Sequence, residues 1–134
     1  MIDRRFLLTG AAALGLLPLA GPARATIDYT PGLVDARLAA GETVLVDFWA
    51  SWCSTCRAQS RVMDELRAAN PAYDAAIAFI RVDWDLYATG DLSTRLNIPR
   101  RSTLVMLRGE RELGRIVAGT REAEIRALLD LGLA

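Results

Sequence analysis

The sequence predicts a small α/β domain in which helices and strands pack in layers, and three observations support this. First, residues 43–49 and 77–82 are almost continuously apolar and β-prone, which is typical of strands covered on both faces of a sheet. Second, apolar residues recur at helical spacing between and after these runs. Third, two further β-prone runs flank Gly109, which indicates a hairpin. The predicted order is helix, strand, helix, strand, helix, hairpin and helix.

The first helix is expected over residues 31–40. Thr30 is a favoured N-cap, Pro31 is favoured at the first helical position, and Gly41 predicts the end of the helix. The strand at residues 43–49 follows directly and is expected at the centre of the sheet.

The next helix is expected over residues 57–69, because apolar side chains recur at helical spacing and Pro71 ends the pattern. The second buried strand, residues 77–82, follows it. Residues 86–96 are expected to contain a short helix that leads into the hairpin.

The two strands of the hairpin are predicted at residues 103–107 and 114–117. Thr120 is expected to cap a last helix, whose first turn contains acidic residues that complement the helix dipole. The buried stripe of this helix is expected to contain Ile125, Leu128 and Leu129.

The composition is that of one compact domain. The chain has 134 residues, of which 52% are hydrophobic, enough for a sizeable core. The formal net charge is zero, so no excess of basic residues indicates nucleic acid as a partner. The chain contains no histidine, which excludes a Ser-His or Cys-His catalytic pair and any histidine-ligated metal site within it.

The first 25 residues predict a cleavable signal peptide, followed by a domain over residues 26–134. Arg4 and Arg5 form a basic segment, an apolar run follows, and a small-x-small cleavage signal ends at Ala25. We therefore expect an exported protein that is soluble in the periplasm after cleavage, where a disulfide is chemically permitted. The arginine pair leaves the choice between general secretion and twin-arginine export open.

An uncleaved membrane anchor is the alternative interpretation of this segment. The apolar run, residues 6–20, is shorter than the ~20 residues that a membrane span needs. It is also interrupted by Gly10, Gly15 and Pro18. Both features favour the signal peptide.

The chemistry of the chain is expected to depend on Cys53 and Cys56, which are separated by Ser54 and Thr55. A thiolate attacks a disulfide and forms a mixed disulfide, which a second nearby thiol then resolves. At the start of a helix, the backbone N–H groups and the helix dipole should lower the pKa of the Cys53 thiol, and Cys56 should lie deeper. Half of a zinc site is one alternative, but zinc prefers four ligands and the chain offers no further cysteine and no histidine. An inert buried pair is the other alternative.

Residues 44–57, VLVDFWASWCSTCR, resemble the active-site segment of the thioredoxin family, V-D-F-W-A-x-W-C-x-x-C-K/R. Residues 79–83, 96–98 and 103–105 resemble later parts of the same family, so the likeness covers residues 30–131. Within the family, the spacing is most similar to the periplasmic thioredoxin domain of the DsbD-type transmembrane reductases. The resemblance implies the thioredoxin fold, in which helices flank both faces of a central mixed β-sheet.

The resemblance also implies roles for three residues: Cys53 as the nucleophile, Cys56 as the resolving thiol, and Asp47 as the buried acid that relays the proton of Cys56. Burial in a central strand should raise the pKa of Asp47 toward the range that is useful for general acid–base catalysis. Arg81, where the family often has a lysine, should lower it again. A solvated aspartate at the end of a strand is the alternative.

One departure from the family concerns the loop before residue 103. Ser102, after Arg101, stands where the family has a cis-proline. Because a cis bond before serine costs about 3–4 kcal/mol, we expect a trans or strained peptide there. The Ser102 hydroxyl could hydrogen-bond the Cys53 thiolate. The residues expected to bind substrate are Trp52, Ser54, Thr55, Arg101 and Ser102, whereas Trp49 is expected in the core.

These features favour a dithiol reductase of protein disulfides that needs no cofactor. Ser54 and Thr55 place no charge between the cysteines that would make the pair a strong oxidant. The periplasm is kept oxidising, so such a reductase implies a membrane-bound electron donor. Two alternatives remain open: an oxidase or isomerase on the same scaffold, and a non-enzymatic protein whose thiolates hold a metal or an iron–sulfur cluster. The midpoint potential distinguishes an oxidase from a reductase. Colour or bound metal in the purified protein would indicate the metal-binding or cluster-binding alternative.

Overall fold

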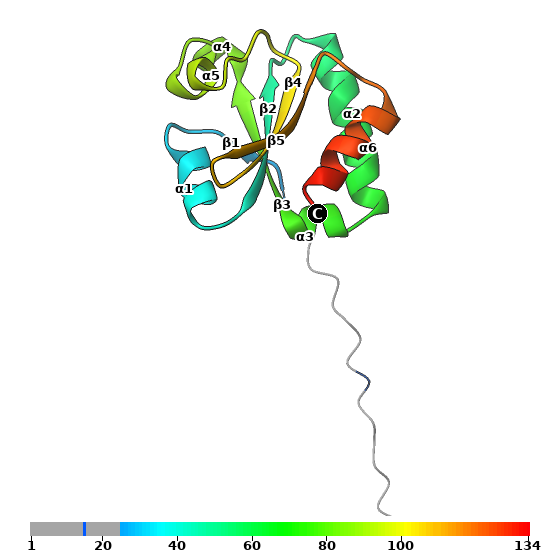
Figure 1. Cartoon of the computed structure of the whole chain (residues 1–134). Coiled ribbons are helices and arrows are strands. Elements are labelled where there is room, and N and C mark those ends of the chain that lie inside the picture. Colours follow the sequence, from blue (N-terminus) through cyan, green and yellow to red (C-terminus); the bar gives the residue numbers. More distant parts are fainter. Residues whose placement is uncertain (1–14, 16–24) are drawn as a thin grey trace, which may run out of the picture.

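A mixed five-stranded β-sheet forms the centre of the fold, in the order β1-β3-β2-β4-β5 (Figure 1). The strands are β1 (Ile27–Asp28), β2 (Thr43–Trp49), β3 (Ile77–Asp83), β4 (Thr103–Arg108) and β5 (Arg111–Val117). β3 runs parallel to β1 and β2, whereas β4 is antiparallel to β2 and β5. The predicted mixed sheet is therefore confirmed.

The structure is a computed structural model that describes Gly15 and residues 25–134 of the chain. The predicted signal peptide, residues 1–25, thus lies outside the described residues except for its positions 15 and 25. No helix in the described part of the chain is both long and apolar enough to cross a membrane.

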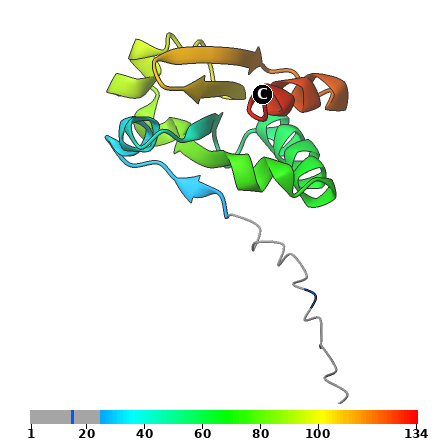
Figure 2. The same cartoon turned by 60° about the horizontal axis from the view of Figure 1, so that its bottom comes forward.

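Helices cover both faces of the sheet (Figures 1 and 2). They are α1 (Leu33–Ala39), α2 (Ser54–Ala69), α3 (Ala72–Ala76), α4 (Trp84–Tyr87), α5 (Asp91–Arg95) and α6 (Glu122–Leu131). One hydrophobic cluster joins α2, α3 and α6 to one face of the sheet, and a second joins α1 and α5 to the other face, with Trp84 and Tyr87 of α4 packed against it. This arrangement confirms the predicted layers.

The central position of β2 in the sheet explains why its sequence is almost continuously apolar. Side chains alternate between the two faces of a strand, and here both faces are covered by helices. Val44, Val46 and Phe48 belong to the cluster on the α1 side, whereas Leu45 belongs to the cluster on the α2 side. Alternation therefore directs Asp47 toward the face that α2 covers.

The predicted helix caps at Thr30 and Thr120 are wrong. α1 begins two residues later than expected, and its N-cap is Gly32, whose φ of 88° turns the chain into the helix. Thr30 contributes its carbonyl, which accepts a 3.0 Å hydrogen bond from Leu33 N–H. α6 is preceded by Arg121, which makes no side-chain cap bond.

Other boundaries also differ from the predicted ones. α2 begins at Ser54, three residues earlier than expected, so the first turn contains the end of the cysteine motif. Residues 86–96 overlap two short helices, α4 and α5, instead of one. β1 and α3 are short elements that no pattern in the sequence indicated.

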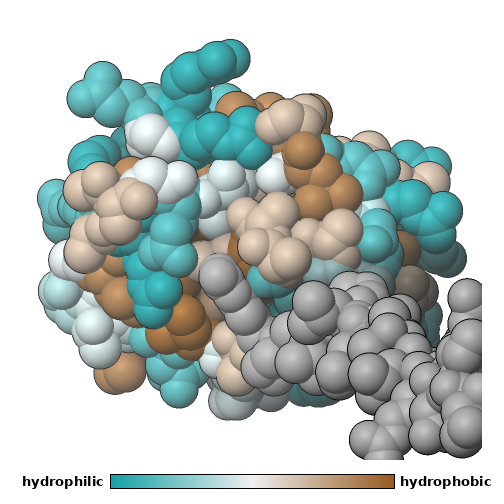
Figure 3. All heavy atoms as spheres, turned by 90° about the horizontal axis from the view of Figure 1, so that it is seen from below, coloured by the Kyte–Doolittle hydropathy of each residue, from teal (hydrophilic) through white to brown (hydrophobic). Residues whose placement is uncertain are grey.

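The connection from β2 to α2 lies at the upper end of the sheet in Figure 1, which places the cysteine motif there. The end seen from below is shown in Figure 3, where hydrophobic and hydrophilic residues are interspersed over the part that is not covered by grey atoms. The functional site therefore lies at the carboxyl end of the central parallel strands, as expected for an open α/β sheet.

Candidate active site

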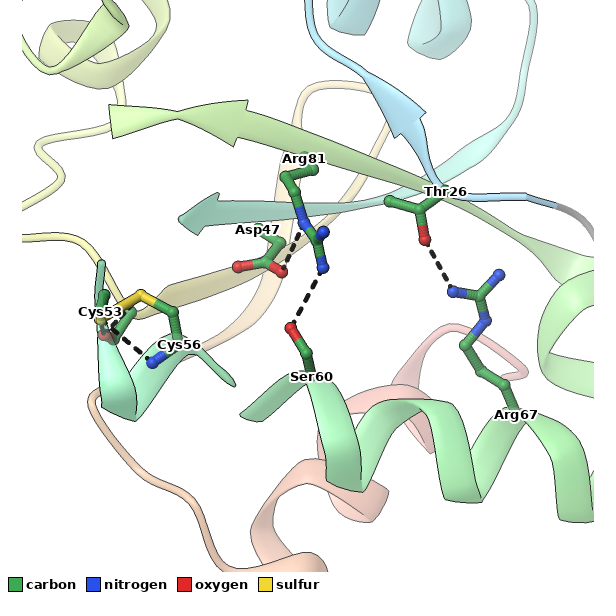
Figure 4. Close-up of polar contacts among 8 residues, drawn as sticks. Thr26, Asp47, Cys53, Cys56, Ser60, Arg67 and Arg81 are labelled. Atoms are coloured by element: carbon green, nitrogen blue, oxygen red, sulfur yellow. Dashed lines mark hydrogen bonds and ion pairs between the residues drawn. A yellow bond between two sulfur atoms is a disulfide. The ribbon is translucent and has the colours of Figure 1, made fainter. Parts of the chain in front are cut away.

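Cys53 and Cys56 form a disulfide across the first turn of α2, with their Cα atoms 5.3 Å apart (Figure 4). Cys53 is the N-cap of the helix, and its Sγ accepts a 3.1 Å hydrogen bond from the Cys56 backbone N–H. The first N–H groups of a helix have no partner within it and carry the positive end of its dipole. In the reduced protein, we expect the same position to stabilise a negative charge on the Cys53 sulfur.

Both cysteines are buried in this disulfide form. The exposed fraction is 3% for Cys53 and 0% for Cys56, so Cys56 is the deeper residue, as predicted, but by a small margin. Trp49 and Trp84 pack against the pair. A substrate sulfur therefore has access to only a small edge of Cys53 and no direct access to Cys56.

Asp47 lies in β2 beside Arg81 of β3, to which it is paired in register. Its exposed fraction is 5%, and its Oδ1 has no hydrogen-bond partner among the described residues. The pKa of Asp47 is raised from 3.8 to about 7. Burial of the carboxyl is the main cause, the charge of Arg81 lowers the pKa, and the charge of Asp64 raises it. The alternative of a solvated aspartate is therefore wrong, and the carboxyl can take up or release a proton near neutral pH.

The geometry of Arg81 explains why it does not neutralise Asp47. Its Nε lies 3.8 Å from Asp47 Oδ2, beyond normal hydrogen-bond distance. The guanidinium instead donates a 3.1 Å hydrogen bond to Ser60 Oγ and stacks 4.5 Å from the ring centre of Trp49. In Figure 4, the Asp47 carboxyl lies between the disulfide and the Arg81 guanidinium. The desolvation of the carboxylate therefore exceeds the attraction of the nearby cation.

The peptide bond before Ser102 is trans and the backbone of Ser102 is strained, as expected where serine replaces the cis-proline. The described residues contain no cis peptide bond, and Ser102 has a φ of 62°, a region that residues other than glycine rarely occupy. Its hydroxyl lies 3.0 Å from Cys53 Sγ of the disulfide, whereas the hydrogen bond to the Cys53 thiolate of the reduced protein stays a prediction. An equal contact to Cys56 Sγ, also 3.0 Å, was not predicted.

Trp52 and Arg101, two of the residues predicted to bind substrate, contact each other; Trp52 is exposed and Arg101 is half-buried. The Arg101 guanidinium lies 4.4 Å from the ring centre of Trp52, which is 56% exposed. The Trp52 Nε1–H donates to the carboxylate of Asp85 at 3.0 Å. No pattern in the sequence indicated Asp85, which lies 33 residues away in the chain.

The other predicted substrate residues differ from one another in exposure. Ser54 is exposed and Thr55 is half-buried in the first turn of α2. Ser102 has an exposed fraction of 0%, so its hydroxyl faces the sulfurs instead of solvent. Trp49, predicted in the core, is half-buried.

Gln59 of α2 is a residue of this site that the sequence analysis missed. It is fully buried, and its Nε2 donates to the carbonyl oxygens of Ser102 at 2.9 Å and Gly119 at 3.0 Å. One signal could have found it, because the buried stripe that contains Met63 and Leu66 extends back by one turn to position 59. A polar residue on such a stripe needs a buried partner.

Within the described part of the chain, no group of three or more cysteine, aspartate or glutamate side chains is placed to hold a metal ion. Two thiolates supply half of the four ligands that zinc prefers. A metal held by Cys53 and Cys56 would therefore need further ligands from another molecule.

Comparisons with known proteins agree with this geometry. A family model described as Thioredoxin matches residues 28–130. The thioredoxin of Alicyclobacillus acidocaldarius is 29% identical over 105 residues, which cover 78% of this chain and 95% of that protein. The thioredoxin of Mycobacterium tuberculosis is 33% identical over 95 residues, which cover 70% of this chain and 78% of that protein.

Solved structures show the same likeness. Trxlp of Edwardsiella tarda has a TM-score of 0.66 and 27% identity, and the match covers 77% of this chain and 98% of that one. The likeness to the DsbD-type domains in particular stays a prediction.

Proposed function

The chain belongs to the thioredoxin family of thiol–disulfide oxidoreductases, and we propose that it is an exported member that reduces protein disulfides through the Cys53–Cys56 dithiol. The family acts on proteins that contain disulfides. The observation that carries the proposal is the position of the Cys53 sulfur at the N-cap of α2, where it accepts the Cys56 N–H, with Cys56 within disulfide-bonding reach. This arrangement supports one sulfur that attacks and a second that resolves.

The proposed reaction transfers two electrons from the dithiol to the substrate in two exchanges. The Cys53 thiolate attacks one sulfur of the substrate disulfide, so that a mixed disulfide forms and the other substrate sulfur leaves as a thiolate. The Cys56 thiol then loses its proton and attacks Cys53 Sγ, which releases the second substrate thiolate and restores the protein disulfide. Asp47, whose pKa lies at about 7, is the proposed acceptor of the Cys56 proton.

Reduction is favoured over oxidation because Ser54 and Thr55 add no charge that would make the thiolate of Cys53 unusually stable. Reduction in an oxidising compartment needs a continuous supply of electrons. We therefore include a membrane-bound electron donor in the proposal.

We expect the protein to catalyse the reduction of insulin disulfides by dithiothreitol, and Cys53→Ser to lower the rate to that of dithiothreitol alone. The rate is measured by the precipitation of the freed insulin chain. The midpoint potential is measured in a redox equilibrium with glutathione. A value close to that of thioredoxin, about −270 mV, supports reduction. A value close to that of strong periplasmic oxidants, about −120 mV, contradicts the proposed reduction and indicates that the protein oxidises its substrates.

Export through residues 1–25 is the second part of the proposal, supported by the basic segment, the apolar run and the cleavage signal that ends at Ala25. In a Gram-negative host, we expect the protein in the periplasmic fraction with Thr26 as its first residue, as intact-mass spectrometry can show. Full-length protein in the membrane fraction or the cytoplasm would contradict it.

A further inference from the structure

The hydroxyl of Ser102 contacts both sulfurs of the disulfide at the same distance. Its Oγ lies 3.0 Å from Cys53 Sγ and 3.0 Å from Cys56 Sγ, and these are its hydrogen-bond contacts in the described part of the chain. A serine hydroxyl has one proton to donate and lone pairs that accept. It can therefore donate to one sulfur while it accepts from the other.

The reduced protein contains the pair of groups that suits this hydroxyl. Reduction by two electrons and one proton breaks the Sγ–Sγ bond and leaves a thiolate on Cys53 and a thiol on Cys56. The thiolate only accepts hydrogen bonds, whereas the thiol can donate one. The Ser102 O–H then donates to Cys53, and the Cys56 S–H donates to Ser102 Oγ. Because hydrogen bonds to an ionised group are stronger than neutral ones, this arrangement stabilises the reduced pair more than the disulfide.

The backbone of Ser102 needs support to hold the hydroxyl in this place, because a left-handed φ of 62° is unfavourable for serine. Three hydrogen bonds provide the support. Ser102 N–H donates to the Phe48 carbonyl at 2.7 Å, and the Ser102 carbonyl accepts from Ala118 N–H at 2.8 Å and from Gln59 Nε2 at 2.9 Å. Two of the three come from backbone, and one comes from a side chain.

Gln59 is the side chain that connects this loop to the helix of the cysteines. It lies one turn after Cys56 in α2, and its amide nitrogen also donates to the Gly119 carbonyl at 3.0 Å. Both neighbours are acceptors, so the network requires the nitrogen of the amide to face them. The Gln59 Oε1 has no hydrogen-bond partner among the described residues, which is an unfavourable arrangement for a buried acceptor. The Gln59 side chain is thus oriented so that its amide nitrogen donates both hydrogen bonds, at the cost of leaving its oxygen without a donor in the described part of the chain.

We infer that Ser102 is a catalytic residue whose hydroxyl is shared by Cys53 and Cys56 in the reduced protein, and that Gln59 is the positioning residue that holds Ser102 between them. The inference rests on the proposed dithiol chemistry. It adds to that chemistry a hydroxyl that shifts the equilibrium between disulfide and dithiol toward the dithiol, and a buried amide that acts only through this hydroxyl.

The test is the equilibrium between the full chain and glutathione, in which two glutathione thiols become glutathione disulfide, the protein disulfide becomes one thiolate and one thiol, and one proton is released to the buffer. We expect Ser102→Ala to lower the equilibrium constant for reduction of the protein about tenfold, which equals about 30 mV. The matched control is Ser93→Ala, because Ser93 is also buried and its hydroxyl donates to the Tyr87 carbonyl at 2.7 Å instead of to sulfur. The control should keep the wild-type constant. An unchanged constant in Ser102→Ala overturns the role of the hydroxyl.

A double-mutant cycle tests Gln59. Gln59→Met keeps the side-chain length without its two donors, and we expect it to lower the same constant about three- to tenfold. The double variant should match Ser102→Ala alone, because Gln59 acts through Ser102. Effects that add independently overturn the positioning role. If Gln59→Met does not fold, Gln59→Glu serves in the same cycle, since a carboxyl group has at most one hydrogen to donate in place of the two of the amide.

The equilibrium constant requires no protein substrate, so the two proposals fail separately. A wild-type chain that equilibrates with glutathione but does not reduce insulin contradicts the proposed function only. A wild-type chain that reduces insulin, with a constant that Ser102→Ala leaves unchanged, contradicts the inference only.

Discussion

Replacement of Asp47 by asparagine is expected to stabilise the protein above pH 7 by about 2 to 4 kcal/mol. The buried carboxyl has its pKa raised from 3.8 to about 7, first by desolvation. The folded protein therefore binds this proton more tightly than the unfolded chain does. Stability falls as the pH rises from about 4 to about 7, because the folded state must then hold a buried carboxylate. Asparagine keeps the shape of the neutral acid and removes the cost of the charge.

Urea unfolding of the wild type and Asp47→Asn at several pH values measures this effect. The difference in free energy of unfolding should be small near pH 4 and should reach its maximum above pH 7. Asp74→Asn is the matched control, because Asp74 is also buried but accepts a 2.6 Å hydrogen bond from Arg67 Nε. Loss of that ion pair should lower the free energy of unfolding, whereas Asp47→Asn should raise it. Equal pH dependence in Asp47→Asn and wild type would contradict the account of Asp47.

The same substitution should slow catalysis. Asp47 is the proposed acceptor of the Cys56 proton, so the substitution removes a carboxyl whose pKa lies at about 7. General acid–base groups of this kind contribute about 10²-fold or more to a rate. The loss should be seen in single-turnover measurements as slower release of substrate from the mixed disulfide. The first attack by Cys53 should keep most of its rate. A variant that is more stable but less active is the expected outcome.

The central strands were predictable because their environment is uniform. β2 and β3 are covered by helices on both faces, so almost every position is apolar, and the pattern does not depend on details of packing. Asp47 was recognisable for the same reason, as the one acid within β2. The helix predicted over residues 57–69 missed the first turn of α2, residues 54–56, although the cysteine pair was expected at the start of a helix.

The helix starts were less predictable, because capping preferences are weak compared with tertiary packing. Thr30 and Pro31 have favourable local chemistry, but the chain turns into α1 at Gly32, and Val34 is then fully buried against the sheet. Hydrophobic burial of such residues amounts to about 1.5–3 kcal/mol each, more than a typical cap of about 1 kcal/mol. Thr120 failed as a predicted cap because Arg121 occupies that position.

The supporting contacts of the site were the least predictable part. Gln59 reaches Ser102 across 43 residues and Gly119 across 60, and Trp52 reaches Asp85 across 33. No local pattern encodes such pairs. The contacts of Gln59 arise only when the loops before β4 and after β5 meet α2, and that of Trp52 arises only when α4 lies beside the loop before α2. The substitution at Ser102 was visible in the sequence, whereas its contact with both sulfurs depends on the left-handed backbone that these long-range bonds hold.

The central claim is that the sulfur of Cys53 attacks and that of Cys56 resolves, and a matched pair of single substitutions tests it. Without the Cys56 sulfur, the mixed disulfide has no intramolecular route to release, so Cys56→Ser should accumulate a covalent adduct with a disulfide-bearing protein such as insulin. Cys53→Ser should form none, because the remaining sulfur lies in the residue with 0% exposure. The measurement is the amount of adduct on non-reducing electrophoresis, before and after addition of dithiothreitol. We predict a reducible adduct with Cys56→Ser alone. Equal adducts with both variants, or an adduct with Cys53→Ser alone, would contradict the assignment.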